Sequence, residues 1–238
     1  MKTIYTCLIV VFFSINTSYG QISVVLGQDL TSSKVISGPA INKIFNKQLK
    51  SALGIRYPVR KGYYNKDKTG EFYFLLAESF DGLGEEDTLH KNIQILKVTR
   101  SGNQFVKTGE INDRVLGEDE TSIWIWSRYC EFKDIDKDGY IDPVLIYGSS
   151  ALNGISDGRL KIVTWYKGQK VILRHQNGTL DDERNFHIDP AFYRLPLVVQ
   201  KRVRLIMKNL GENTAVIFPW GWEKKMDKKK LFIQEAGS

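Results

Sequence analysis

Cysteine is scarce in this sequence. Only Cys7 and Cys130 occur among the 238 residues, and Cys7 falls in an N-terminal segment that we expect to be removed. A chain left with one cysteine cannot form an intramolecular disulfide bond. An exported protein of this kind is held together by packing, by a bound metal, or by both.

Long apolar runs are also missing beyond the N-terminus. No later segment approaches the roughly 18 uninterrupted apolar residues of a membrane-spanning helix, so we expect no transmembrane segment in the mature chain. The start of the chain has the three parts of a secretory signal peptide: a positive charge at Lys2, an apolar run from Cys7 to Ile15, and the small residues Ser18 and Gly20 before a cleavage site. That apolar run is itself too short to cross a bilayer.

The sequence therefore predicts a signal peptide over residues 1–20 and a mature protein over 21–238, located in the periplasm, at the cell surface or outside the cell. Acidic residues are in the minority, because the formal charge is +7, or +6 without Lys2. This balance favours an anionic glycan or an acidic protein as partner, and nucleic acid is not expected outside the cell. Without a repeat or a linker, residues 21–238 fit a single α+β domain that ends in a Lys-rich tail.

Two segments have the apolar spacing of helices. The first covers 39–53, with Ser37 as a cap and Gly54 as a stop, and the second covers Leu197–Leu210, after a proline and before Gly211. Strands are predicted where runs rich in β-branched and aromatic residues alternate with turn residues. These runs are Glu71–Glu78, Asn92–Thr99, Gln104–Ile111, Thr121–Phe132, Val144–Tyr147, Lys161–Tyr166 and Val171–Arg174. The fold class expected is α+β, mainly antiparallel sheet with about two helices.

Acidic residues are concentrated in one short loop, 134–142, which reads DIDKDGYID. Carboxylates stand at loop positions 1, 3, 5 and 9, and a glycine stands at position 6. Calcium takes about six to eight oxygen ligands, alternating Asp residues place oxygens around a tight turn, and glycine permits the bend. The predicted metal ligands are Asp134, Asp136, Asp138, the carbonyl of Tyr140, and Asp142. The alternative is a plain Asp-Gly turn that binds nothing.

This loop differs from an EF-hand, because position 12 holds Leu145 instead of the bidentate glutamate and the flanking residues look like strands. It resembles the D-x-D-x-D-G-x-x-D calcium loop of FG-GAP-type repeats, in which the Asp side chains ligate the ion. That resemblance covers about a dozen residues and occurs once, whereas a propeller needs several blades. More broadly, the chain resembles uncharacterised exported proteins of Bacteroidota-type bacteria, some loosely labelled with surface polysaccharide biosynthesis. The segment from Arg174 to Asn185 carries part of that resemblance.

Two other constellations have residues that could do chemistry. The segment Gly154–Gly158 matches the G-x-S-x-G pattern around Ser156, but a polar loop precedes it and a strand follows it, whereas a nucleophile elbow needs a strand and then a helix. His175, His187 and Asp189 lie near the acidic run 181–183. They suggest a second metal site or a general base, with a charge-paired surface loop as the alternative.

Two tryptophan pairs raise the question of ligand stacking. Trp124 and Trp126 are two residues apart and share one strand face, which predicts core packing or, if exposed, a platform for sugar rings. Trp220 and Trp222 precede the lysines at 224, 225 and 228–230. We expect a solvated tail there, with contact to an anionic surface as the alternative.

No complete catalytic set is present, so the expected function is a noncatalytic, calcium-binding module that binds a glycan or a protein at the cell surface. The first alternative is a polysaccharide-processing enzyme that uses residues 175–189. A pocket that gathers His175, His187 and the acidic run would favour it. The second alternative is an inhibitor or immunity-type protein. A flat surface with a protruding loop would favour either this alternative or the noncatalytic module.

Overall fold

The computed structural model describes residues 31–84, 88–151, 153–213 and 216–235. The expected signal peptide over 1–20 lies outside these residues. Two antiparallel sheets form the body of the protein. The five-stranded sheet has the order β1-β2-β3-β6-β7, with strands β1 Ser32–Ile36, β2 Val59–Asp67, β3 Gly70–Glu78, β6 Asn92–Ser101 and β7 Gln104–Arg114.

The seven-stranded sheet has the order β14-β13-β12-β11-β10-β8, and β9 pairs with β10 beside β8. Its strands are β8 Ser122–Ile125, β9 Glu131–Lys133, β10 Asp142–Ser150, β11 Arg159–Tyr166, β12 Gln169–Gln176, β13 Asn185–Ile188 and β14 Phe232–Gln234. Two short strands, β4 Gly82–Leu83 and β5 Thr88–Leu89, pair with each other.

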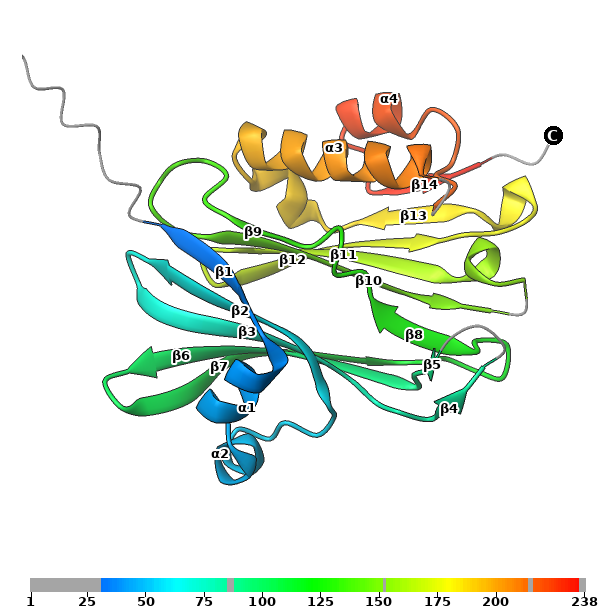
Figure 1. Ribbon diagram of the computed structural model, residues 1–238. Coiled ribbons are helices and arrows are strands. Elements are labelled where there is room, and N and C mark those ends of the chain that lie inside the picture. Colours follow the sequence, from blue (N-terminus) through cyan, green and yellow to red (C-terminus); the bar gives the residue numbers. More distant parts are fainter. Residues whose placement is uncertain (1–30, 85–87, 152, 214–215, 236–238) are drawn as a thin grey trace, which may run out of the picture.

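Helices cover the outer face of each sheet, so the molecule has four layers (Figure 1). Helices α1 Gly38–Ile44 and α2 Lys47–Ala52 lie on the five-stranded sheet, and α3 Leu197–Glu212 and α4 Trp222–Asp227 lie on the other. Three 3-10 turns complete the elements: η1 Ile155–Asp157, η2 Asp181–Glu183 and η3 Pro190–Arg194. The expected α+β class with mainly antiparallel sheet is confirmed. Among the described residues, no helix has the length and apolar character needed to span a membrane.

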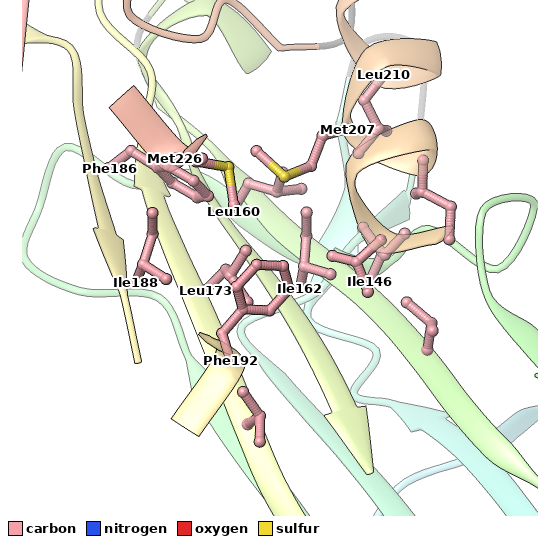
Figure 2. Packing of buried hydrophobic residues seen from close by; sticks show 14 of the residues in the cluster. Ile146, Leu160, Ile162, Leu173, Phe186, Ile188, Phe192, Met207, Leu210 and Met226 are labelled. Carbon is pink, nitrogen blue, oxygen red and sulfur yellow. The ribbon is translucent and has the colours of Figure 1, made fainter. Parts of the chain in front are cut away.

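The central strands of both sheets, β3, β6, β10 and β11, are buried on both faces, which explains why they are nearly continuously apolar. In β3, Phe74 and Leu76 face the other sheet, whereas Tyr73 and Leu75 face α1 and α2. The outer face of the seven-stranded sheet packs against α3, α4 and η3. Figure 2 shows this contact, in which Ile162 and its neighbours meet the helical side chains.

The two sheets are in close contact where Trp165 of β11 lies over Gly109 of β7. A Cβ atom at Gly109 would stand 2.1 Å from Cη2 of Trp165, so only glycine leaves room for the indole ring. The ring also packs edge-on against Phe74, with 5.7 Å between the ring centroids. Gly109 lies next to a register shift in the pairing of β6 and β7, and such irregularities bend the strand locally.

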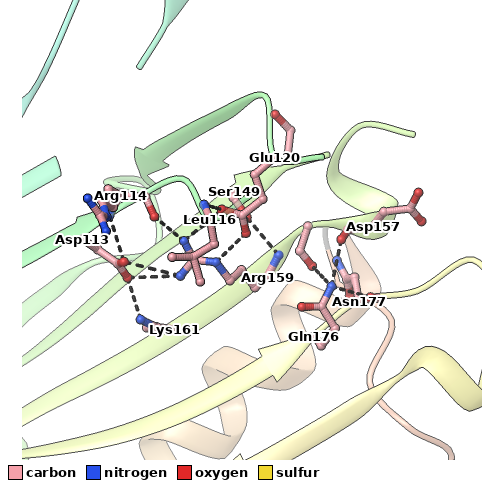
Figure 3. A network of polar contacts seen from close by, with 12 residues as sticks. Asp113, Arg114, Leu116, Glu120, Ser149, Asp157, Arg159, Lys161, Gln176 and Asn177 are labelled. Atoms are coloured by element: carbon pink, nitrogen blue, oxygen red, sulfur yellow. Dashed lines mark hydrogen bonds and ion pairs between the residues drawn. The ribbon is translucent and has the colours of Figure 1, made fainter. Parts of the chain in front are cut away.

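A polar network joins the sheets at their β7 and β11 strands (Figure 3). The guanidinium of Arg159 lies 3.3 Å from Asp113 and also binds both carboxylate oxygens of Glu120. Lys161 lies 2.6 Å from Asp113, and the Ser149 hydroxyl donates to Glu120 at 2.7 Å. Burial works against the charge of Arg159, but the two carboxylates outweigh it, so the pKa of Arg159 lies above its ordinary value. The network therefore links the two sheets by ion pairs at the edge of their apolar interface.

The structure corrects two of the expected elements. The helix predicted over 39–53 is two helices, because Phe45 is fully buried under the sheet and Asn46 caps α2 by accepting from the Leu49 amide at 2.9 Å. The strand predicted over Thr121–Phe132 is interrupted. Its two ends, β8 and β9, both pair with β10, and residues 126–130 leave the sheet in a turn closed by the Tyr129 amide on the Trp126 carbonyl.

The segment expected as a solvated Lys-rich tail is folded as far as it is described. Residues 222–227 form α4, and 232–234 form β14, which pairs with β13. Met226 and Ile233 are buried in the core beneath them, and Trp222 packs against that core. Trp220 remains exposed. Two apolar residues placed among the lysines therefore hold this segment on the sheet.

Candidate functional site

The acidic loop lies between β9 and β10, so the expected position between two strands is confirmed. Its backbone turns at Lys137 and Gly139, which have positive φ angles of 61° and 90°. The Asp134 carboxylate accepts from the amides of Asp138 at 3.1 Å and Gly139 at 2.9 Å, and Asp138 accepts from the Tyr140 amide at 3.0 Å. The Asp side chains thus shape the turn by binding its backbone amides.

Three carboxylates converge in this loop. One oxygen each of Asp134, Asp136 and Asp138 lies within 4.8 Å of the others, and all three side chains are partly exposed. The cluster could hold a metal ion, with hard carboxylate oxygens as ligands. It is the sole group of three or more His, Cys, Asp or Glu residues with such spacing in the part of the chain that the structure describes.

Asp142 begins β10 at the end of the loop and is fully buried. Its Oδ2 accepts from the Ile135 amide at 3.0 Å, whereas Oδ1 has no hydrogen-bond partner among the described residues. Burial raises the pKa of Asp142 to about 7, and the nearby charges of Asp136 and Asp138 add to that rise. An unpartnered buried carboxylate oxygen is costly, and a cation beside it would remove that cost. Asp142 stands outside the group of three within 4.8 Å.

Two lysines and a tyrosine contact the cluster from other parts of the fold. The Lys167 ammonium lies 2.7 Å from Oδ2 of Asp138, and the Tyr166 hydroxyl donates to Asp136 at 2.9 Å. Both residues belong to the β11–β12 turn. Burial raises the pKa of Asp138, but the Lys167 ammonium and the Tyr140 amide outweigh it, so that pKa lies below its ordinary value. These contacts partly neutralise the carboxylates.

The loop also contacts the five-stranded sheet through the β2–β3 turn. The Lys68 amide donates to the Gly139 carbonyl at 3.0 Å, and the Ile141 amide donates to the Asp67 carboxylate at 3.0 Å. The Lys68 ammonium binds the Asp138 carbonyl. The acidic loop is therefore the place where turns from both sheets meet. These partners are about 70 residues away in the sequence, and no local pattern could have predicted them.

The structure separates the second set of predicted residues. His175 pairs with Phe186 across β12 and β13, so His187, the next residue along β13, points to the opposite face of the sheet. His175 is buried and its Nε2 lies 2.8 Å from Oδ1 of Asn177, whereas His187 is exposed. Asp189 caps η3 by accepting from the Ala191 amide at 2.8 Å.

The acidic run beside them has a structural partner as well, because Asp181 pairs with Arg184 at 2.7 Å. Burial lowers the pKa of His175 to about 4, which keeps the ring neutral near pH 7. The described residues therefore contain no pocket that brings His175 and His187 together.

The G-x-S-x-G segment forms η1, a single 3-10 turn, and β11 follows it. Ser156 is exposed, and the Asp157 carboxylate binds Thr179 and Asn153. A nucleophile elbow requires a strand before the serine and a helix after it. The order here is a turn followed by a strand, as the sequence predicts.

The tryptophans fall into two environments. Trp124 of β8 and Trp126, which directly follows the strand, stack on each other, with centroids 6.0 Å apart and planes at 27°. Trp126 is buried in the core and Trp124 is partly exposed at its edge. The pair is therefore largely part of the core, and only Trp124 is left to meet a ligand.

Comparison of the chain with protein-family models, with curated proteins and with solved structures gave no match. Function has to be inferred from the loop, the fold and the surface.

Proposed function

We propose that this protein is a noncatalytic calcium-binding module that acts outside the cytoplasm and binds a glycan or a protein. The observation that carries the proposal is the grouping of Asp134, Asp136 and Asp138, with one oxygen of each within 4.8 Å of the others. The buried Asp142, whose pKa the charges of Asp136 and Asp138 help to raise, has an unpartnered oxygen in addition. Like charges at this distance repel each other, and a divalent cation relieves that repulsion.

The donor set favours calcium over other metals. The three clustered groups are carboxylates, with no histidine or cysteine among them, and zinc prefers nitrogen and sulfur ligands. Magnesium requires nearly ideal octahedral geometry and retains several waters. A flexible loop with alternating Asp residues and a backbone carbonyl suits the larger, less directional calcium ion. Asp142 and the carbonyl of Tyr140 complete the proposed ligand set.

Calcium in this loop would act on the whole sandwich. The loop binds the β2–β3 turn through Lys68 and Asp67 and the β11–β12 turn through Tyr166 and Lys167. An ion that fixes the loop therefore fixes one end of both sheets. With Cys130 as the only cysteine beyond the proposed signal peptide, a metal takes the place that disulfides hold in many exported proteins.

The noncatalytic part of the proposal rests on how the reactive groups are placed. Burial raises the pKa of the Cys130 thiol to about 12, so it stays protonated and is a poor nucleophile. Ser156 stands on a 3-10 turn, and His175 and His187 lie on opposite faces of their sheet. A fluorophosphonate probe should therefore leave Ser156 unlabelled, and labelling that disappears in Ser156→Ala would refute this.

The proposed export from the cytoplasm can be tested separately from the noncatalytic character. Lys2, the apolar run after it and the small residues before Gln21 support cleavage at that point. Mass spectrometry of the natively expressed protein should find Gln21 as the first residue. An intact residue 1–20 segment in the cytosolic fraction would contradict it.

Calorimetry on the metal-stripped protein tests the calcium site. We expect one site, and we expect Asp136→Asn to weaken it, because the substitution removes a charge and keeps the size of the side chain. Asp182→Asn is the matched control, since Asp182 is exposed and lies outside the loop. No heat of binding in the wild-type protein, or equal heats in both variants, would sink the proposal.

A further inference from the structure

The positive charge of the protein is concentrated near the C-terminal end of the sequence. Residues 194–238 hold ten Lys and Arg against four Asp and Glu, a surplus of +6, whereas residues 21–193 hold 23 of each kind. The undescribed positions of the later segment, 214–215 and 236–238, have no charged side chain. The whole surplus of the proposed mature protein therefore belongs to α3, α4 and the residues beside them.

Helices α3 and α4 lie side by side in one outer layer. The guanidinium of Arg204 in α3 pairs with the Asp227 carboxylate at 2.7 Å and donates to the Glu223 carbonyl at 3.0 Å, and these two residues lie toward opposite ends of α4. Figure 1 shows the two helices on the side of the seven-stranded sheet that faces away from the five-stranded sheet. Their outer faces therefore form one surface, which we call the helical surface.

The outer face of α3 alternates apolar side chains with lysines. Leu197, Lys201, Leu205 and Lys208 follow each other at intervals of four, four and three residues, so they form one stripe along the helix. All four are exposed, whereas the buried residues of α3, such as Val203, face the core on the opposite side. The helix thus presents a mixed stripe outward.

Exposed apolar side chains gather in the same layer. Trp220, which stands directly before Gly221 and α4, is 82% exposed, and Leu197 is 71% exposed. Seven of the fourteen exposed large hydrophobic side chains among the described residues lie in the segment 197–232. Exposed apolar groups gathered in this way mark a surface that meets a partner.

Most lysines of this layer have no acidic partner. The ion pairs that lie wholly within it are Arg204 with Asp227 and Lys208 with Glu212. Lys201 and the lysines at 224 and 228–230 are exposed, and in the described part of the chain their ammonium groups form no ion pair. Their charge is therefore available to an anionic partner.

We propose that the helical surface lies flat on a bilayer that contains anionic phospholipids, a property separate from the proposed calcium site. The unpaired lysines meet the headgroup phosphates, and each lysine near an anionic membrane raises the affinity about fivefold. The side chains of Trp220 and Leu197 enter the boundary between headgroups and acyl chains, where tryptophan is favoured. A hydrated polyanion would leave Leu197 and Leu205 without an apolar partner, whereas a bilayer supplies both phosphate groups and an apolar medium.

Sedimentation with sucrose-loaded vesicles tests the proposal on residues 21–238, which include every described residue and leave out the apolar run within 1–20. The buffer contains chelator, so that calcium cannot bridge protein and lipid. We expect the protein to pellet with vesicles of phosphatidylglycerol and phosphatidylcholine, and to stay in solution with phosphatidylcholine alone. Added salt should weaken the binding, because it screens the charges.

A triple variant tests the lysines. Replacing the lysines at 228–230 by glutamine should weaken binding about a hundredfold, at about fivefold for each charge. The matched control replaces three exposed lysines on the other side of the molecule by glutamine: Lys43 of α1, Lys47 of α2 and Lys66 of β2. This control removes the same charge and should retain most of the affinity.

A second variant tests the insertion of the indole. Trp220→Ser should weaken binding several-fold, and it should reduce the quenching of tryptophan fluorescence by brominated phosphatidylglycerol. Phe80→Ser is the control, because Phe80 is a 60% exposed aromatic residue outside the helical surface. A melting temperature close to that of the wild-type protein shows that each variant is folded.

Several results would overturn the proposal. These are no pelleting with the anionic vesicles, equal pelleting with the neutral ones, equal affinities in the two triple variants, or equal affinities in Trp220→Ser and Phe80→Ser. Tighter binding to polyglutamate than to the vesicles, at equal concentration of charge, would identify an acidic protein as the partner instead. Tighter binding to heparin would identify a polyanionic glycan.

Discussion

Replacing Asp136 by asparagine should change stability in a way that depends on calcium. Its carboxylate lies within 4.8 Å of those of Asp134 and Asp138. Two unit charges at that distance repel by about 1 kcal/mol in water and about 3 kcal/mol at an effective dielectric constant near 20. The partly exposed site and the Lys167 ammonium place the effect at the lower end. In chelator, the free energy of unfolding of Asp136→Asn should therefore be equal to that of the wild-type protein or higher by up to about 1 kcal/mol.

Calcium should reverse the order of stability of the wild-type protein and Asp136→Asn. An ion at a hundredfold excess over its Kd stabilises the wild-type protein by about 2.7 kcal/mol. If the lost carboxylate weakens binding about a hundredfold, the same calcium concentration stabilises Asp136→Asn by only about 0.4 kcal/mol. The hydrogen bond from Tyr166 to residue 136 survives, because an asparagine amide can also pair with a hydroxyl.

Urea unfolding in chelator and in millimolar calcium measures both free energies. Asp182→Asn, measured in parallel, should respond to calcium as the wild-type protein does. The reasoning fails if calcium leaves the wild-type transition unchanged, or if Asp136→Asn is destabilised equally in both buffers. The second result would mean that Asp136 only shapes a turn.

Three further predictions concern the packing. Gly109→Ala should lower the urea midpoint, with a loss of about 1–3 kcal/mol, because the new Cβ collides with Trp165. Arg159→Met should cost about 3 kcal/mol or more, since it removes the cation that pairs with the buried Glu120, while Asp113 keeps Lys161, and a neutral result would contradict the network. His175 has a pKa of about 4 in the folded protein and about 6.5 unfolded, so its stabilising contribution is complete above pH 6.5 and declines as the pH falls toward 4. Protonation of His175 should account for a loss of about 2 kcal/mol between pH 7 and 5. Because the raised pKa of Asp142 acts in the opposite direction over this range, the loss should be measured as the difference between the pH profiles of the wild-type protein and His175→Gln.

The sequence predicts the strands well where the fold buries both faces. The run Glu71–Glu78, for example, is apolar between its two glutamates, and its bounds lie within one residue of the observed strand. The break within Thr121–Phe132 is different, because no glycine or proline marks it. It arises from pairing with β10: the end of β10 pairs with β8, and the start of β10 pairs with β9. Such a break depends on tertiary contacts and has no local signal.

The acidic loop could be predicted because its residues are contiguous in the sequence, whereas the residues that surround it in space come from distant segments. Its carboxylates and its glycine are contiguous in the chain, so spacing alone indicates a cation site. The contacts of the loop with Lys68 and Tyr166, and the contact of Arg204 with α4, are assembled from separate segments.

The position of the acidic loop also has a kinetic consequence. Its hydrogen bonds to Asp67 and Lys68 span 74 and 70 residues of sequence, and the Tyr166 contact needs the β11–β12 hairpin. Long-range contacts of this kind form late, because the chain must first lose the entropy of closing large loops. A calcium ion held there would stabilise the native state more than the folding transition state, and so would slow unfolding while leaving the folding rate nearly unchanged. In the proposed function outside the cytoplasm, calcium would then set the lifetime of the folded form.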